Sequence, residues 1–261
     1  MIRKINNIII AVFGVLIVLT WSSCRKMSMT SGNGHVVTEK RQLVPFTEVI
    51  NETSFNVIIV EDSISEARVE AESNLIPYIR TLVNGNTLII DTRNGGIQTT
   101  FPINIYVSSP EINSIELSGS GRIDADNVSA DFFKVKLSGS GEIATKVEAG
   151  FIDAKISGSG DMHMVAVSQN MYAEVIGSGD MSIEGTNDDG EFRLSGSGNI
   201  LSYDLFQKTL DAKISGSGDM FVRVSDYLKV NISGSGSLNY IGFPVIDAKI
   251  TGSGSVINHN K

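Results

Sequence analysis

The chain has 261 residues, and its 29 acidic against 21 basic residues give a formal net charge of −8. An excess of negative charge disfavours nucleic acid as a partner, because a phosphate backbone is bound mainly by Lys and Arg. Cys24 is the only cysteine, which excludes an internal disulfide.

The first 24 residues have the parts of an export signal. Arg3 and Lys4 precede an apolar run at residues 8–19 that is short for a membrane span. The following Trp21-Ser22-Ser23-Cys24 resembles the lipobox of a bacterial lipoprotein. We predict a signal peptide at residues 1–23 and lipidation of Cys24. An uncleaved anchor helix is the alternative. Cleavage removes the only tryptophan, which disfavours a sugar cleft built on an indole ring.

Residues 24–35 are polar and rich in Gly, Ser and Met, and we expect a tether from the lipid to the folded part. Residues 36–113 predict an irregular β cap for the repeats that follow, with a separate domain as the alternative. Alternating Phe55, Val57 and Ile59 indicate a strand, and the segment 83–86 indicates a tight turn between strands. Residues 74–80 are expected to form a single helical turn.

Eight Gly-Ser-Gly motifs follow at steps of 18 to 20 residues, which is the period of a stacked solenoid. We predict that residues 114–257 form an eight-repeat, single-stranded parallel β-helix, and that the fold is all-β. A flexible Gly/Ser linker is the alternative, but apolar residues alternate on both sides of each motif. The first glycines of the motifs are Gly119, Gly139, Gly158, Gly177, Gly196, Gly216, Gly234 and Gly252.

The alternation assigns side chains to the two faces of each coil. The second residue before each Gly-Ser-Gly and the second residue after it are apolar, so both columns are predicted to face inward. Met162, Met181 and Met220 are then core residues. Both motif glycines fall on the inward side, which predicts a narrow corner, and the middle serine faces outward. An Asp follows the motif in three repeats and resembles a calcium turn, but a solvated polar face is the simpler interpretation.

The outward positions carry charges rather than a catalytic set. Lys155, Glu174 and Arg193 are predicted to stack in one column and to pair between coils. His35, His163 and His259 are far apart in sequence, and no metal-ligand spacing is present. We therefore predict no catalytic residue, no metal and no cofactor.

The S-G-S-G series, the segment around Phe46, Phe55 and Asn74-Leu75, and the signal peptide resemble the head GIN domain family of auto-transporter adhesins, over most of residues 40–257. This family occurs largely in lipoproteins and envelope proteins of the Bacteroidetes. The resemblance implies a pectin-lyase-like β-helix and a role in cell adhesion.

These observations together predict a non-enzymatic outer-membrane lipoprotein, facing the periplasm or the cell surface. It would be held in the membrane by its lipid and would bind a surface glycan or a protein. A polysaccharide lyase, or another glycan-cleaving β-helix enzyme, is the alternative. The strand edge after Val256 must be covered by the tail or by another subunit, so an oligomer is possible.

Overall fold

The computed structural model describes residues 29–93 and 96–260. The predicted signal peptide and Cys24 lie outside these residues. A helix with the length and apolar sequence needed to cross a membrane is not found within the two described ranges.

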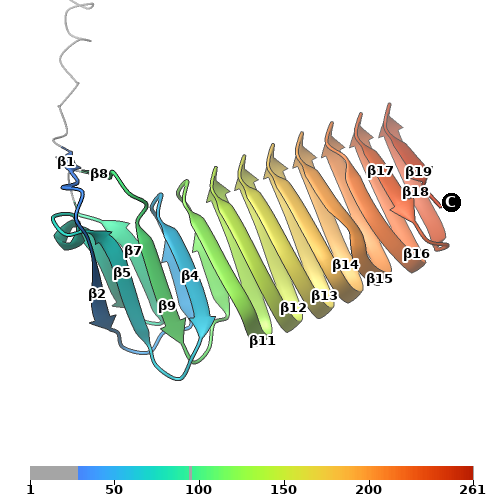
Figure 1. The fold of residues 1–261 in the computed structure, drawn as a ribbon. Coiled ribbons are helices and arrows are strands. Elements are labelled where there is room, and N and C mark those ends of the chain that lie inside the picture. Colours follow the sequence, from blue (N-terminus) through green and yellow to red (C-terminus); the bar gives the residue numbers. More distant parts are fainter. Residues whose placement is uncertain (1–28, 94–95, 261) are drawn as a thin grey trace, which may run out of the picture.

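The repeats form a parallel β-solenoid, as their spacing predicts (Figure 1). The coils from β11 to β16 each contribute one long strand, the coils at the two ends contain shorter strands, and the Ser-Gly of each motif turns the chain into the next coil. Pairing is in register over most of a coil, so that Ile143 pairs with Met162 and Met162 with Met181. The strands are β10 (Ser114–Leu117), β11 (Arg122–Gly139), β12 (Glu142–Gly158), β13 (Asp161–Gly177), β14 (Asp180–Gly196), β15 (Asn199–Gly216), β16 (Met220–Gly234), β17 (Ser237–Ile241), β18 (Val245–Gly252) and β19 (Ser255–Asn258).

The core is a set of apolar columns that run along the stack. Met162, Met181 and Met220 are fully buried in one of these columns, as predicted. His163, the next residue after Met162, lies on the exposed face. The last coil is less covered, because β18 pairs only with β16 and β19 only with β17. Ile250 is therefore 43% exposed, whereas Ile232, one coil earlier in the same column, is 2% exposed.

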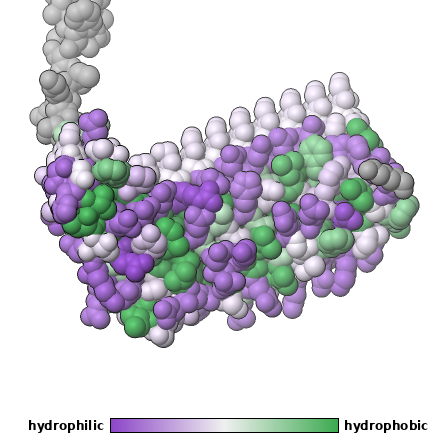
Figure 2. Space-filling view, viewed as in Figure 1, coloured by the Kyte–Doolittle hydropathy of each residue, from purple (hydrophilic) through white to green (hydrophobic). Residues whose placement is uncertain are grey.

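The Gly-Ser-Gly motifs form one edge of the solenoid, visible as the pale row in Figure 2. Ser197 N and Gly198 N both donate to the carbonyl oxygen of Gly177 in the preceding coil, at 2.8 and 3.2 Å. A Cβ on Gly196 would lie 2.1 Å from that oxygen, and Gly196 has a φ of +129°. The first glycine is thus required because backbones of adjacent coils meet, rather than because the core is narrow.

The second glycine of the motif fits the expected narrow corner more closely. A Cβ on Gly160 would lie 2.4 Å from the carbonyl oxygen of Gly141 and 2.8 Å from the inward Leu137 side chain. The middle serines face outward, as predicted. No hydrogen bond joins their hydroxyls to one another within the described residues, and their backbone amides make the contacts between coils.

The acidic residues after the motifs also act between coils. Asp180 Oδ1 accepts from Asn199 N at 2.9 Å, and Asp219 Oδ1 accepts from Ser237 N at 2.7 Å. Each of these carboxylates therefore binds the backbone of the following coil, which explains an acidic residue at this position.

Coils of the solenoid already form before the first motif. Their order in the stack, however, differs from their order in the sequence. Strands β3 (Glu48–Asn51) and β4 (Asn56–Glu61) pair in parallel with β10 and β11 on one side. On the other side they pair in parallel with β7 (Thr87–Thr92) and β9 (Asn104–Ser109). The earlier segment is therefore held between two later ones.

Antiparallel strands cover the N-terminal end. Strand β2 (Val36–Gln42) pairs with β5 (Glu66–Glu72), and β5 with β9. Strand β6 (Ile79–Asn84) turns into β7 through Gly85, as the segment 83–86 predicts. A 3-10 turn at Ile76–Tyr78 provides the expected helical turn.

A buried carboxylate joins the first described residues to this cap. Glu72 is 1% exposed and accepts from Gly34 N at 2.6 Å and from Thr100 N at 2.8 Å. The backbone N–H of Thr100 is the main cause that lowers the pKa of Glu72. Nearby, β1 (Thr30–Ser31) pairs with β8 (Ile97–Gln98). Residues 30–34 therefore contact the cap directly.

Candidate functional site

The sequence-predicted columns of charge are present, but their ion pairs differ from the prediction. Lys155, Glu174 and Arg193 lie in register on adjacent coils. Lys155 nevertheless pairs with Asp153 of its own coil, Nζ to Oδ2, at 3.0 Å. In the same way Arg193 Nε donates to Glu191 at 2.9 Å. Pairing within a coil therefore replaces the expected pairing through Glu174.

Tyr172 fills the space between these two pairs. Its ring lies 4.9 Å from Lys155 Nζ and 5.4 Å from Arg193 Cζ. Burial raises the pKa of the Tyr172 hydroxyl to about 12, and the neighbouring Glu174 carboxylate adds to this shift. On this face, Lys155 and Arg193 are thus each paired with a carboxylate of their own coil and lie on either side of the Tyr172 ring.

Glu174→Lys should destabilise the protein, because Glu174 lies between Lys155 and Arg193 in a column of cations. We expect a loss of roughly 0.2 to 1 kcal/mol for each unfavourable neighbour, and a smaller loss at high salt. Urea unfolding at low and high salt measures this effect. Glu148→Lys is the control, because its column neighbours Ser129 and Val167 are uncharged. Equal losses for the two variants would contradict the prediction.

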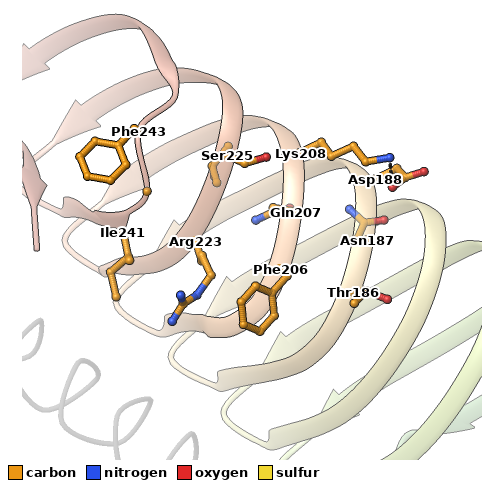
Figure 3. A pocket seen from close by; sticks show the side chains of 12 residues that line it. Thr186, Asn187, Asp188, Phe206, Gln207, Lys208, Arg223, Ser225, Ile241 and Phe243 are labelled. Carbon is orange, nitrogen blue, oxygen red and sulfur yellow. Dashed lines mark ion pairs between the residues drawn. The ribbon is translucent and has the colours of Figure 1, made fainter. Parts of the chain in front are cut away.

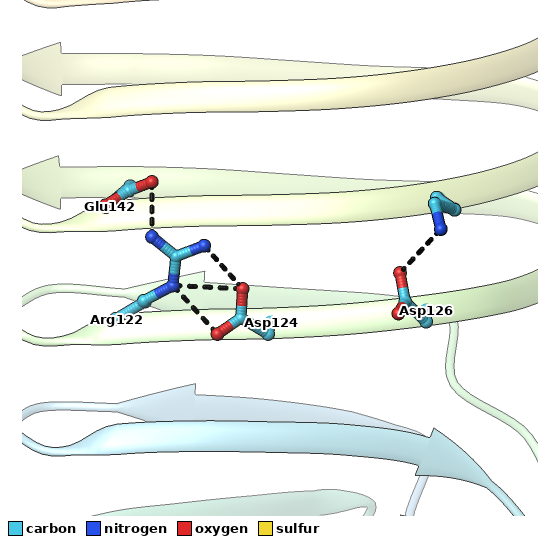
Figure 4. A network of polar contacts seen from close by, with 5 residues as sticks. Arg122, Asp124, Asp126 and Glu142 are labelled. Carbon is cyan, nitrogen blue, oxygen red and sulfur yellow. Dashed lines mark hydrogen bonds and ion pairs between the residues drawn. The ribbon is translucent and has the colours of Figure 1, made fainter.

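One cluster brings carboxylates to an arginine, which is the arrangement that a lyase would need (Figure 4). Arg122 Nε and Nη2 donate to Asp124, at 2.8 and 2.7 Å, and Nη1 pairs with Glu142 on the next coil. The hydrogen bonds with Asp124 are the main cause that raises the pKa of Arg122. The Arg122 guanidinium is therefore already bound by the carboxylates of Asp124 and Glu142. The adjacent hollow is lined by Lys146 and His163 among others and measures only about 140 Å³. Arg122 does not line this hollow.

A larger hollow lies away from the Gly-Ser-Gly edge, where the coil length changes. The step from Gly196 to Gly216 is 20 residues, and the next two steps are 18 residues. The register between β15 and β16 shifts between Ser202 and Phe206, so residues 203–205 bulge from the ladder. Bulges of this kind re-aim side chains and often lie next to functional sites.

We call this hollow the corner trench. It has a volume of about 520 Å³ and is built from three consecutive residues on each of four successive coils (Figure 3). Its lining residues are Thr186, Asn187 and Asp188; Phe206, Gln207 and Lys208; Arg223, Val224 and Ser225; and Ile241, Gly242 and Phe243.

The register explains why these residues make a trench. Asn187 pairs with Gln207, and Gln207 with Val224, so the central column faces inward and forms the floor. Gly242 continues this column without a side chain. The residues on either side of the column form the walls, with Phe206 57% exposed on one wall and Phe243 88% exposed on the other.

The floor contains polar groups without partners. Asn187 Oδ1 accepts from Ser168 at 2.9 Å, but its Nδ2 has no partner. Neither amide atom of Gln207 has one, although the residue is only 4% exposed. A Cβ on Gly190 would lie 2.6 Å from Gln207 Oε1, so the amide of Gln207 points into the solenoid and fills the space beside Gly190.

The walls are held by contacts outside the hollow. Arg223 Nε donates to the Tyr203 carbonyl oxygen of the bulge at 2.7 Å, and its Cζ lies 4.6 Å from the centre of the Phe206 ring. Lys208 pairs with Asp188 at 2.8 Å. On the far side, Asn260 bonds to both N and O of Gly242, at 2.8 and 2.7 Å, and so fixes the turn that presents Phe243.

The sequence predicted none of the residues in this trench. The change in spacing from 20 to 18 residues was the one available signal, because a shortened coil cannot cover its longer neighbour. Groups of three or more His, Cys, Asp or Glu placed to hold a metal ion are not found among residues 29–93 and 96–260.

Comparison with known proteins gives the family. Residues 45–166 and 147–244 match the family described as "Putative auto-transporter adhesin, head GIN domain". The chain belongs to this family. Head GIN membership confirms the resemblance seen in the repeats and assigns the protein to a group named for adhesion. No curated protein matches the chain.

Solved structures share the fold over nearly their whole length. Two are named "putative adhesin": one from Parabacteroides merdae, with a TM-score of 0.83 at 21% identity, covers 88% of this chain and 99% of its own. The other, from Parabacteroides distasonis, has a TM-score of 0.83 at 22% identity and covers 88% and 100%. A "putative lipid binding protein" from Parabacteroides distasonis has a TM-score of 0.80 at 26% identity and covers 88% and 99%. They confirm the β-solenoid architecture.

Proposed function

We propose that this head GIN protein is a lipid-anchored protein of the cell envelope that binds a macromolecule and does not cleave it. The signal peptide and Cys24 support the anchor, with attachment to the outer membrane. The family and two of its structural neighbours are named for adhesion. Extended, regular faces of a solenoid suit large partners better than small substrates.

The observation that favours binding over catalysis is that three cationic side chains on the surface are already ion-paired. Lys155, Arg193 and Arg122 each have a carboxylate partner on the surface. Catalysis of proton transfer needs a group that is free to exchange its proton near a bound substrate. The corner trench, by contrast, exposes the rings of Phe206 and Phe243, and exposed aromatic rings in a hollow are features of a binding site.

Cys24→Ala tests the anchor. We expect an unprocessed precursor and complete loss of labelling by a fatty-acid analogue, because the thiol of Cys24 is the only one in the chain that can carry the lipid. Ser197→Ala, on the exposed edge, should be labelled like the wild type. Unchanged labelling of Cys24→Ala would refute the lipoprotein assignment.

The adhesive role is tested on whole cells and on purified protein. Cells that lack the protein, or carry only Cys24→Ala, should adhere less to host matrix, glycans or other bacteria than wild-type cells do. Equal adhesion to all three would remove the support for this role. The purified mature protein should release no unsaturated or reducing sugar ends from a glycan panel, and their release would favour the lyase alternative.

A further inference from the structure

The C-terminal end of the solenoid is an open sheet edge. Strand β18 pairs with β16 on one side only, and all of its residues are exposed. Ile246 is 40% exposed, whereas Leu228, which precedes it in the same inward column, is fully buried. A free strand edge with apolar side chains is a template for pairing with another strand, and proteins normally cover or charge such edges. This end is therefore a candidate interface.

The tail of the chain does not cover this edge. His259 N donates to the carbonyl oxygen of Tyr240 at 2.9 Å, and Asn260 bonds to Gly242. These tail residues therefore continue β19 along the other face of the coil. The cap, with residues 30–34 against it, lies at the opposite end of the solenoid (Figure 1). Of the tail and a second subunit, the structure favours the second subunit as the cover of β18.

The charges of β18 lack the partners that the same tripeptide has in earlier coils. The sequence Asp-Ala-Lys occurs three times. In the first copy Lys155 pairs with Asp153 at 3.0 Å, and in the second Asp211 pairs with a lysine of the next coil at 2.6 Å. In the third copy, which lies in β18, neither Asp247 nor Lys249 makes an ion pair within the described part of the chain. Both charges can therefore pair with a second molecule.

The sequence of β18 is complementary to itself when two copies run antiparallel about Ala248. A two-fold axis at this residue places Asp247 of each copy opposite Lys249 of the other. On the inward face it places Ile246 opposite Ile250. Directly opposite residues of an antiparallel pair point to the same face of the sheet. The apolar interior of one solenoid would therefore continue into the interior of the other.

The same charges disfavour other registers. A shift by two residues places either Lys249 opposite Lys249 or Asp247 opposite Asp247, and like charges directly opposite each other are destabilising. A shift by one residue turns the inward side chains of one copy toward the outer face of the other. Charged side chains on an edge also deter pairing with an arbitrary apolar strand. The edge is therefore matched to its own sequence.

We propose that the C-terminal end binds a second copy of this protein, with β18 of the two copies paired antiparallel about Ala248 in a two-fold symmetric, tail-to-tail dimer. This inference goes beyond the proposed function and does not depend on it, because it rests on the last coil. The columns of charge continue through the interface. Asp211, Lys229 and Asp247 alternate in register on three successive coils, and Lys249 of the second copy comes next. The two caps then lie at the far ends of one long solenoid.

The test uses the mature chain, residues 24–261, with Cys24→Ser in every sample so that a disulfide cannot produce a dimer. Analytical ultracentrifugation of this parent chain over a range of concentrations should show a reversible monomer–dimer equilibrium. Lys249→Glu and Asp247→Lys should each weaken the dimer about tenfold or more, because each places two pairs of like charges across the two-fold axis. An equimolar mixture of the two variants should form a heterodimer, because each then supplies the charge that the other lacks.

Lys213→Glu is the matched control. Lys213 belongs to the same tripeptide and lies in the same column as Lys249, but it is two coils away from the edge. This variant should dimerise like the parent chain. Formation of the heterodimer from Lys249→Glu and Asp247→Lys also shows that each variant is folded, so that loss of the homodimer is not a loss of structure.

Three results would overturn the inference. One is a parent chain that stays monomeric up to its highest soluble concentration, and another is a Lys249→Glu dimer as tight as that of the parent chain. The third is the absence of a heterodimer from the mixture of the two charge variants. Whole-cell adhesion tests the proposed function separately. If the protein is monomeric while cells that lack it lose adhesion, this inference fails and the proposed function stands.

Discussion

Gly196→Val should lower the free energy of unfolding by about 3 kcal/mol or more. A Cβ at this position would lie 2.1 Å from the carbonyl oxygen of Gly177 and 3.0 Å from its carbonyl carbon, which are backbone atoms that cannot rotate away. The φ of +129° adds strain for any residue with a Cβ. Denaturant unfolding followed by circular dichroism measures the loss.

Ser197→Ala is the matched control at the next residue. The Ser197 side chain is exposed, and its contact with the preceding coil is made by the backbone N–H at 2.8 Å, which alanine keeps. We expect a loss of about 0.5 kcal/mol or less. Similar losses for the two variants would mean that the coils do not meet closely at this edge.

Phe192→Ala should cost about 3–5 kcal/mol, near the upper end of this range. Phe192 is fully buried, and its neighbours in the same column are Ala173 and Ala212. One large ring thus fills the space that two small residues leave. Because Ala154 precedes Ala173 in this column, the truncated protein would have four alanines in a row and a cavity that the stacked backbones cannot close. Thermal and urea unfolding give the size of the loss.

Moving the ring by one coil tests this explanation. The double variant Phe192→Ala/Ala212→Phe restores the total volume of the column and should recover part of the lost free energy of unfolding. Ala212→Phe alone should be destabilised, because two rings would then compete for one space. Purely additive effects would indicate that the two positions do not share a cavity.

The sequence predicted the solenoid well because each repeat carries the same information. The inward columns follow from strict alternation, and the eight equal motifs fix the register of each coil against the next. Strand pairing between residues 18 to 20 positions apart is nearly local for a β fold, so a repeated pattern is enough to specify it. The corner trench lies where the coil length departs from this pattern. A change in spacing marks an irregular coil, but it does not predict which side chains will line the resulting hollow.

The ion pairs show the same limit on a smaller scale. The alternation of inward and outward residues placed Lys155, Glu174 and Arg193 in one column correctly. It could not choose between a partner two residues away and one on the next coil, because both lie within reach of a lysine or arginine side chain. Packing around the ring of Tyr172 decided the question in favour of Asp153 and Glu191.

By itself, the sequence determined the architecture of the repeats, the inward columns and the edge formed by the glycines, since these depend on spacing and alternation alone. Only the tertiary structure decided that β3 and β4 lie between segments that follow them in the chain, and that Glu72 joins residue 34 to residue 100. It alone also decided that residues 186, 206, 223 and 241 share one wall. These contacts join segments of different length and pattern, and their free energy depends on three-dimensional packing that no periodic signal records.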